Sequence, residues 1–195
     1  MLGANDKAEQ TKQLIATKAK DLFIQKGYHK ASMEDIRFHS GMSKGSIYYH
    51  FKSKEALFLY ILELYTQDWI DMWKEKSSNL KTANDKLYAL AELFAMDFES
   101  PLMNASEEFA RSMTAAPDIK KKIDELSGRV LPVIQGVITE GIRNKEFKNI
   151  DINEATIIVY GFLAGIGVVC QTVNNDEIPY MYKKAVDLFL NGFNA

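Results

Sequence analysis

Residues 32–52, SMEDIRFHSGMSKGSIYYHFK, predict two short helices joined by a tight turn. Ser32 is placed to cap the first helix, and Asp35 three residues later completes a capping-box-like pair. Gly41 ends that helix, because glycine readily supplies the positive φ that a sharp turn between helices commonly needs. Ser43 is placed to cap the second helix, which begins directly after it. The stretch therefore predicts a helix-turn-helix.

The second helix carries polar and aromatic side chains in place of a broad apolar face. Within seven residues it offers Lys44, Ser46, Tyr48, Tyr49 and His50. Ile47 and Phe51, four residues apart, share one face and are its expected inward anchors. A helical hairpin with no DNA-binding role would show the same caps and glycine, so the composition of this helix favours DNA. Its donors suit phosphates and base edges in a major groove.

The residues around the motif resemble the N-terminal signature of the tetracycline-repressor (TetR) family. The matching positions are Ala19, Leu22, Phe23, Gly27, Tyr28, Ser32, Met33, Ile36, Gly41, Ser43, Lys44, Gly45, Tyr48, Phe51, Lys54 and Leu57. Over the whole chain the sequence also resembles the multidrug-sensing members of this family. That likeness lies in KGSIYYHFKSKEALFLYIL at 44–62, in Trp69 and Trp73, in PLMNA at 101–105 and in FLNG at 189–192.

Chemistry and resemblance together predict the DNA contacts. Lys44 can reach a phosphate or a guanine edge, and Gly45 lets the backbone approach the duplex closely. The resemblance implies that the tyrosines and His50 contact DNA, that Ser32 and Lys54 hold the flanking phosphates, and that Arg37 faces DNA. The predicted set is Ser32, Arg37, Ser43, Lys44, Gly45, Ser46, Tyr48, Tyr49, His50 and Lys54.

Two alternatives stay open in this set. One of Tyr48 and Tyr49 could pack inside the domain and make no DNA contact. The family usually has small residues where Arg37, His39 and Ser40 stand, so Arg37 and His39 either add contacts or are simply solvated.

Charge is distributed unevenly along the 195 residues, whose net charge is -2. Residues 1–60 hold 10 basic and 6 acidic residues, a net charge of +4, and all three histidines. Residues 61–195 hold 14 and 20, a net charge of -6. A basic head and an acidic body suit one DNA-contacting domain and one domain with another task, although chance could produce the same asymmetry.

Helical spacing of apolar residues recurs along the whole chain, with no sustained strand alternation. Helix boundaries are predicted at Gly27, Ser53, Pro101, Pro117, Gly128, Pro132, Asp151, Pro179 and Gly192. We therefore expect an all-α fold of about nine helices. The predicted domains are a helix-turn-helix DNA-binding domain at 8–53 (motif 32–51) and an effector-binding and dimerisation domain at 54–195, joined by a long helix at 53–76.

A homodimer is expected, because one helix-turn-helix reads too few base pairs and two half-sites lie about 34–36 Å apart or multiples of that. The resemblance places the interface on the last two helices, about 152–171 and 179–192. The predicted interface residues are Gly161, Ala164, Gly165, Val168 and Phe189. Small residues at helical spacing let another helix approach, although close packing within the chain would need them too.

The body offers aromatic and soft side chains for an effector pocket. The predicted ligand-binding residues are Trp69, Trp73, Phe94, Asp97, Phe98, Met103, Phe109 and Met113, which could equally form core. By resemblance, Asp97 stands where the multidrug-sensing members have an acidic pocket residue. Other acidic and tyrosine positions of that pocket are replaced by Tyr65, Thr66, Ser100, Ala110, Ser127 and Val130. A hydrophobic effector is therefore expected, without a specific preference for a cation.

Several other classes of protein are disfavoured by the sequence. The polar N-terminus MLGANDKAEQTK predicts no signal peptide. The apolar run 155–172 is short for a membrane span, so we expect a buried helix of a cytoplasmic protein. Cys170 is the single cysteine and is expected to be an inert buried thiol, a redox sensor being the alternative. No catalytic or metal-spaced motif is found, so we expect no enzyme, cofactor or metal; a non-specific architectural DNA-binding protein is the rival.

Overall fold

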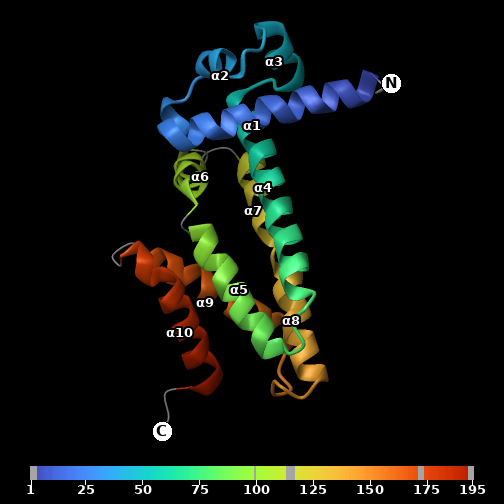
Figure 1. Ribbon diagram of the computed structural model, residues 1–195, viewed down its shortest axis with the longest axis vertical. Helices are drawn as coiled ribbons and strands as arrows, with labels where there is room; N and C mark the ends of the chain where they lie inside the picture. Colours follow the sequence, from blue (N-terminus) through green and yellow to red (C-terminus); the bar gives the residue numbers. More distant parts are fainter. Residues whose placement is uncertain (1–3, 99, 113–116, 171–173, 193–195) are drawn as a thin grey trace. The chain divides into compact units, whose positions relative to one another are not determined.

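The computed structural model describes residues 4–98, 100–112, 117–170 and 174–192, and over these ranges the chain forms ten α-helices, one 3-10 turn and no strand (Figure 1). The helices are α1 (Ala4–Lys30), α2 (Met33–Ser40), α3 (Lys44–His50), α4 (Lys54–Ser77), α5 (Ala83–Phe98), α6 (Pro101–Ser112), α7 (Pro117–Gly128), α8 (Leu131–Arg143), α9 (Ile152–Cys170) and α10 (Ile178–Asn191). The all-α prediction is confirmed. The helix boundaries predicted from proline and glycine lie within two residues of those observed except at Gly27, which is a non-helical position inside α1, three residues before its end at Lys30.

The caps of the helix-turn-helix are those the sequence predicts. The Ser32 hydroxyl accepts the Asp35 N–H at 3.0 Å, and the Asp35 carboxylate accepts the Ser32 N–H at 3.0 Å. Gly41 adopts a φ of 69° and ends α2, while the Ser43 hydroxyl accepts the Ser46 N–H at 3.1 Å. Each helix end is thus fixed by residues within three positions of it.

The first compact unit consists of residues 1–65 and 101–126. In Figure 1, α6 lies against α1 within this unit. Phe109 of α6 is fully buried, and its ring lies 4.8 Å from that of Tyr28 and 4.9 Å from that of Phe58. These aromatic contacts explain why α6 belongs with the N-terminal helices. The boundary predicted between residues 53 and 54 separates a DNA-binding function from an effector-binding function, whereas the compact units are defined by contacts. The predicted boundary therefore stays a prediction.

The second compact unit consists of residues 66–100 and 127–195. α5 packs against α8, α9 and α10 around an apolar core. Polar contacts fix the N-terminal half of α5. Lys86 forms a half-buried ion pair with Glu140 at 2.6 Å, and the Glu146 carboxylate accepts the N–H groups of Ala83 and Asn84 at 3.1 Å. Tyr88 donates a hydrogen bond to Asp187 of α10 at 2.5 Å.

α9 differs from the buried helix expected at its position. By length and composition its window Ile152–Val169 could cross a membrane, with mean hydropathy 1.7, yet only 28% of that window is buried inside the chain. Ile157, Ile158 and Val168 are 66%, 59% and 69% exposed. The expectation was wrong because an apolar helix need not be covered on every side by its own chain. The Cys170 side chain lies outside the described residues.

Candidate nucleic-acid interface

The recognition helix α3 is anchored by two apolar side chains and presents the remainder outward. Ile47 is 1% exposed and Phe51 3%, as their spacing predicts. Tyr48 is 40% exposed and Tyr49 72%, so neither tyrosine is buried in the domain. The Tyr49 ring meets the His50 ring edge-on, with centroids 5.0 Å apart. The outward face therefore offers two exposed phenols, and the phenol ring of Tyr49 lies against the partly exposed His50 imidazole.

The N-terminal turn of α3 is open to solvent. Lys44 and Gly45 are exposed, and a Cβ built on Gly45 would meet no atom closer than the Ser43 hydroxyl at 4.0 Å. The glycine has no positive φ, so neither space nor backbone conformation within the chain requires it. A glycine at this position allows another molecule to approach the backbone closely.

Ser32 and Arg37, at the flank of the motif, are already engaged within the chain. The Ser32 hydroxyl donates to Asp35 at 2.6 Å, and hydrogen bonds from Ser32 and Lys26 hold the pKa of Asp35 down at about 2. The Arg37 guanidinium pairs with Glu34 at 2.6 Å and stacks over the Phe38 ring at 4.1 Å. A phosphate would have to compete with Glu34 for Arg37, because the same N–H donors serve both.

Lys54 is half-buried and makes contacts that sequence reasoning missed. Its ammonium donates to the carbonyls of Tyr28 at 2.9 Å and Ala31 at 3.0 Å, and lies 4.2 Å from the centre of the Tyr28 ring. Burial lowers the pKa of Lys54, and the carboxylates of Glu55 and Glu108 oppose that shift. Two of its three donors thus serve the domain's own backbone, and its predicted phosphate contact stays a prediction.

The residues predicted to bind an effector divide between the two compact units. Trp69, Trp73, Phe94, Asp97 and Phe98 lie in the second unit, Met103 and Phe109 in the first, and Met113 lies outside the described residues. Phe109 is part of the aromatic core of its unit, which accounts for its burial without a ligand.

The second unit holds an aromatic cluster around Phe94. The Trp69 ring meets the Phe94 ring edge-on at 5.7 Å, and the Tyr160 ring lies 6.2 Å from Phe94. Burial, and then the charge of Asp97, raise the pKa of Tyr160. Sequence reasoning did not single out Tyr160, although it stands one helical turn from the small residue Ala164 on α9. The cluster places the Tyr160 phenol beside apolar rings and within the electrostatic influence of the Asp97 carboxylate.

Four of the five predicted dimer residues are exposed among the described residues, and Ala164 is partly buried. The Phe189 ring also packs on the Phe162 ring, with centroids 5.1 Å apart. A Cβ built on Gly161 or Gly165 meets nothing within 4 Å, whereas one on Gly167 would lie 2.9 Å from the Phe98 ring. Packing within the chain therefore explains Gly167 but not the other two glycines. Exposed apolar residues that the prediction omitted extend the same helices: Ile157, Ile158, Val169 and Tyr180.

Two family models together match nearly the whole chain. One, described as bacterial regulatory proteins of the tetR family, matches residues 15–61, and the other, described as QacR-like protein, C-terminal region, matches residues 65–195. The chain belongs to the TetR family. It is a DNA-binding transcriptional regulator, and its helix-turn-helix lies within the range 15–61 that the first model matches.

Individual relatives of this TetR-family regulator match over more than nine tenths of its length. The HTH-type transcriptional regulator QacR of Staphylococcus aureus is 33% identical over 184 residues, 94% of this chain and 98% of that protein. The fatty acid metabolism regulator protein of Bacillus subtilis is 25% identical over 188 residues, 92% of this chain and 94% of that protein. The solved structure of FadR from Bacillus subtilis in complex with stearoyl-CoA has a TM-score of 0.79 at 22% identity, covering 93% of this chain and 99% of that one.

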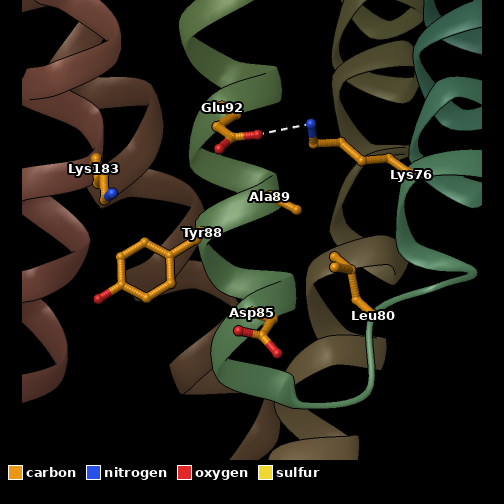
Figure 2. Close-up of a pocket in the computed structure, with 7 residues that line it drawn as sticks. All are labelled: Lys76, Leu80, Asp85, Tyr88, Ala89, Glu92 and Lys183. Carbon is orange, nitrogen blue, oxygen red and sulfur yellow. Dashed lines mark ion pairs between the residues drawn. The ribbon is translucent and has the colours of Figure 1, made fainter.

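A cavity of about 440 Å³ lies on the second unit of the regulator, over α5 and between the end of α4 and α10 (Figure 2). It is lined by Lys76, Leu80, Asp85, Tyr88, Ala89, Glu92 and Lys183. Figure 2 shows the ion pair across its rim between Lys76 and Glu92, at 2.7 Å. None of the predicted ligand-binding residues lines this cavity, and its charged rim suits a hydrophobic effector poorly.

Proposed function

We propose that this TetR-family regulator is a homodimeric, operator-specific repressor that a small hydrophobic molecule releases from DNA. The observation that carries the proposal is the outward face of α3: two exposed tyrosines, an exposed lysine and a glycine that the fold itself does not require. Such a face supplies phosphate contacts and base-edge contacts together, which specific binding needs. The proposed DNA contacts are those of the predicted set. Within that set, Ser32, Arg37 and Lys54 already make hydrogen bonds or ion pairs inside the chain.

Dimerisation is supported by the uncovered apolar face of α9 and α10. Exposed residues recur at helical spacing along α9, at 154, 158, 161, 165 and 168. A second copy of the same face would cover these residues and bring two heads together. A two-fold dimer requires two half-sites of opposite orientation, so the proposed operator is an inverted repeat. We place the protein in the cytoplasm, where operator DNA is found, and assign it no catalytic role.

A hydrophobic effector is supported by the aromatic cluster of the second unit and by the relatives. Phe94, Trp69 and Tyr160 offer apolar rings, with Asp97 near the phenol. One relative of the same fold is a FadR solved with stearoyl-CoA, whose acyl chain is apolar. An effector acts if it binds the DNA-released conformation more tightly than the DNA-bound one, typically by about 1–3 kcal/mol.

The test is selection of genomic fragments by the purified protein, followed by titration of the best fragment at two salt concentrations with a scrambled competitor. An operator-specific dimer should prefer one fragment containing an inverted repeat by about 10³-fold or more. A non-specific architectural protein would bind all fragments alike, with affinity governed by salt.

The effector proposal is tested on the complex so obtained. Stearoyl-CoA and a lipophilic quaternary ammonium are added separately, and operator release is followed by fluorescence anisotropy. Release by either probe should weaken when Trp69 is replaced by alanine, while Met72→Ala, an exposed residue of α4 outside the cluster, keeps it. A probe that binds without weakening the operator complex contradicts the role of that ligand as effector.

A further inference from the structure

The corner between α1 and α2, residues 27–31, is held by two other helices of its unit. Gly27 leaves the helical region with a φ of 78° and a ψ of 167°. Beyond it, the His29 N–H donates to the Glu108 carboxylate of α6 at 3.2 Å. Lys54, at the start of α4, binds the carbonyls of Tyr28 and Ala31. The corner's backbone is therefore bonded on one side to α6 and on the other to α4.

Glu108 and Gly27 fit together closely. A Cβ built on Gly27 would lie 2.8 Å from Oε1 and 2.9 Å from Oε2 of Glu108, so the carboxylate packs directly on the glycine. Any side chain at position 27 would have to push the carboxylate away, besides adopting a φ that L residues rarely adopt. The glycine thus makes room for the carboxylate, and the carboxylate caps the backbone beyond it.

The neighbouring residue of α6 adds an apolar contact at the same place. Phe109 is fully buried against the rings of Tyr28 and Phe58. One turn of α6 therefore supplies both a hydrogen-bond acceptor and an aromatic anchor to the corner. Together they fix both the distance and the orientation of the corner relative to α6.

The corner leads directly into the helix-turn-helix. Ala31, whose carbonyl Lys54 binds, is followed by Ser32, the N-cap of α2. We propose that Glu108 is a positioning residue for operator binding: its carboxylate on Gly27 and His29 fixes the 27–31 corner, and the corner sets the placement of α2 and α3. Glu108 touches no DNA and acts through the corner alone. The proposal rests on operator binding by α3.

Three variants test it, with the fragment selected above as operator. Glu108→Ala removes the acceptor and should lower operator affinity about tenfold, the effect expected for one hydrogen bond to a charged group. Glu108→Gln keeps an acceptor for the His29 N–H and should restore affinity to within about threefold of wild type. Glu107→Gln, whose carboxylate pairs with Arg111 at 3.5 Å, is the matched control and should bind like wild type.

A second readout does not depend on DNA. Hydrogen exchange of the His29 amide, followed by NMR, should be at least tenfold faster in Glu108→Ala than in wild type or Glu108→Gln, while the Ile36 amide of α2 exchanges alike in all three. Loss of protection at both amides would indicate general unfolding and would overturn the positioning role. If Glu108→Ala does not fold, Glu108→Asp replaces it, because the shorter side chain withdraws the acceptor while keeping the charge.

The close fit of the Glu108 carboxylate on Gly27 predicts that the effects of Gly27→Ala and Glu108→Ala on operator affinity are not additive. Gly27→Ala should weaken operator binding in the wild-type background, and should cost at least threefold less in the Glu108→Ala background, where no carboxylate is displaced. Wild-type affinity in Glu108→Ala, an equal loss in Glu108→Gln, or strict additivity with Gly27→Ala would each overturn the proposal. If the wild type itself selects no fragment, operator binding is overturned instead. The His29 amide exchange would then test only the contact of Glu108 with Gly27 and His29.

Discussion

α3 and α9 each present an uncovered face, and the two faces differ in chemistry. α3 has seven residues, buries Ile47 and displays phenols, an imidazole and an ammonium. α9 has 19 residues and displays isoleucine, valine and glycine. A polar face is well solvated by water and can exchange that water for DNA phosphates, so exposing it costs little free energy. An apolar face is stabilised most when it stays buried. The difference indicates a reversible partner for α3 and a lasting one for α9.

The largest effect is expected from a charge on the apolar face. Ile158→Glu should raise the dimer dissociation constant at least ~100-fold, because each interface then buries two unpaired carboxylates. Sedimentation velocity should show a monomer at micromolar concentration, and operator binding should fail with it. Lys148→Glu, in the turn before α9, is the control. A dimer that survives Ile158→Glu places the interface elsewhere.

Removing the anchor of α3 should rank next. Ile47→Ala leaves a cavity beneath the recognition helix and should lower the free energy of unfolding by about 2–5 kcal/mol. Urea denaturation measures this directly. Tyr49→Ala, on the opposite face, should change stability by less than ~0.5 kcal/mol. Equal destabilisation by the two variants would contradict the division of α3 into an anchored and a displayed side.

Truncations on the displayed side of α3 should affect DNA and not folding. Lys44→Ala and Tyr48→Ala should each weaken operator binding by about 1–3 kcal/mol with unchanged unfolding curves. Lys44→Ala should also reduce the salt slope of binding by about 1, because one phosphate contact is lost. Unchanged operator affinity in both variants removes α3 from the interface.

The smallest effect concerns the cap of α2. The pKa of Asp35 is about 2 in the folded chain against an ordinary 3.8, so its contribution to stability is complete above pH 4 and lost as pH falls towards 2. Asp35→Asn should flatten this part of the stability profile, measured by urea denaturation between pH 2 and 5. Asp124→Asn, at an exposed position of α7 in the same compact unit, is the control. An unchanged profile in Asp35→Asn would contradict the role of the capping box.

The comparison also explains what could be predicted from sequence. The caps at Ser32, Gly41 and Ser43 were predicted because each bonds within three or four residues. The hydrogen bond between His29 and Glu108 joins residues 79 positions apart, and that between Lys54 and Tyr28 joins residues 26 positions apart. A local sequence pattern therefore cannot predict either bond.

The candidate sites show the same division between local and distant information. The content of one helix predicted a polar and aromatic outward face but left open whether Tyr48 or Tyr49 packs inside, and the structure exposes both. Burial of α9 was predicted wrongly because composition cannot tell which face the chain itself covers. The effector residues were grouped by type, and Phe109 turned out to belong to the other unit's core because its partner rings lie far away in sequence.

Gly45 carries a consequence for selection experiments. It lies in the first turn of α3 with empty space where a side chain would begin, so alanine there should stabilise the fold by a few tenths of a kcal/mol up to about 1. A library sorted for heat resistance would enrich that substitution, and the same substitution would hold the helix away from the groove. Thermal robustness and target recognition thus favour different residues at a single position.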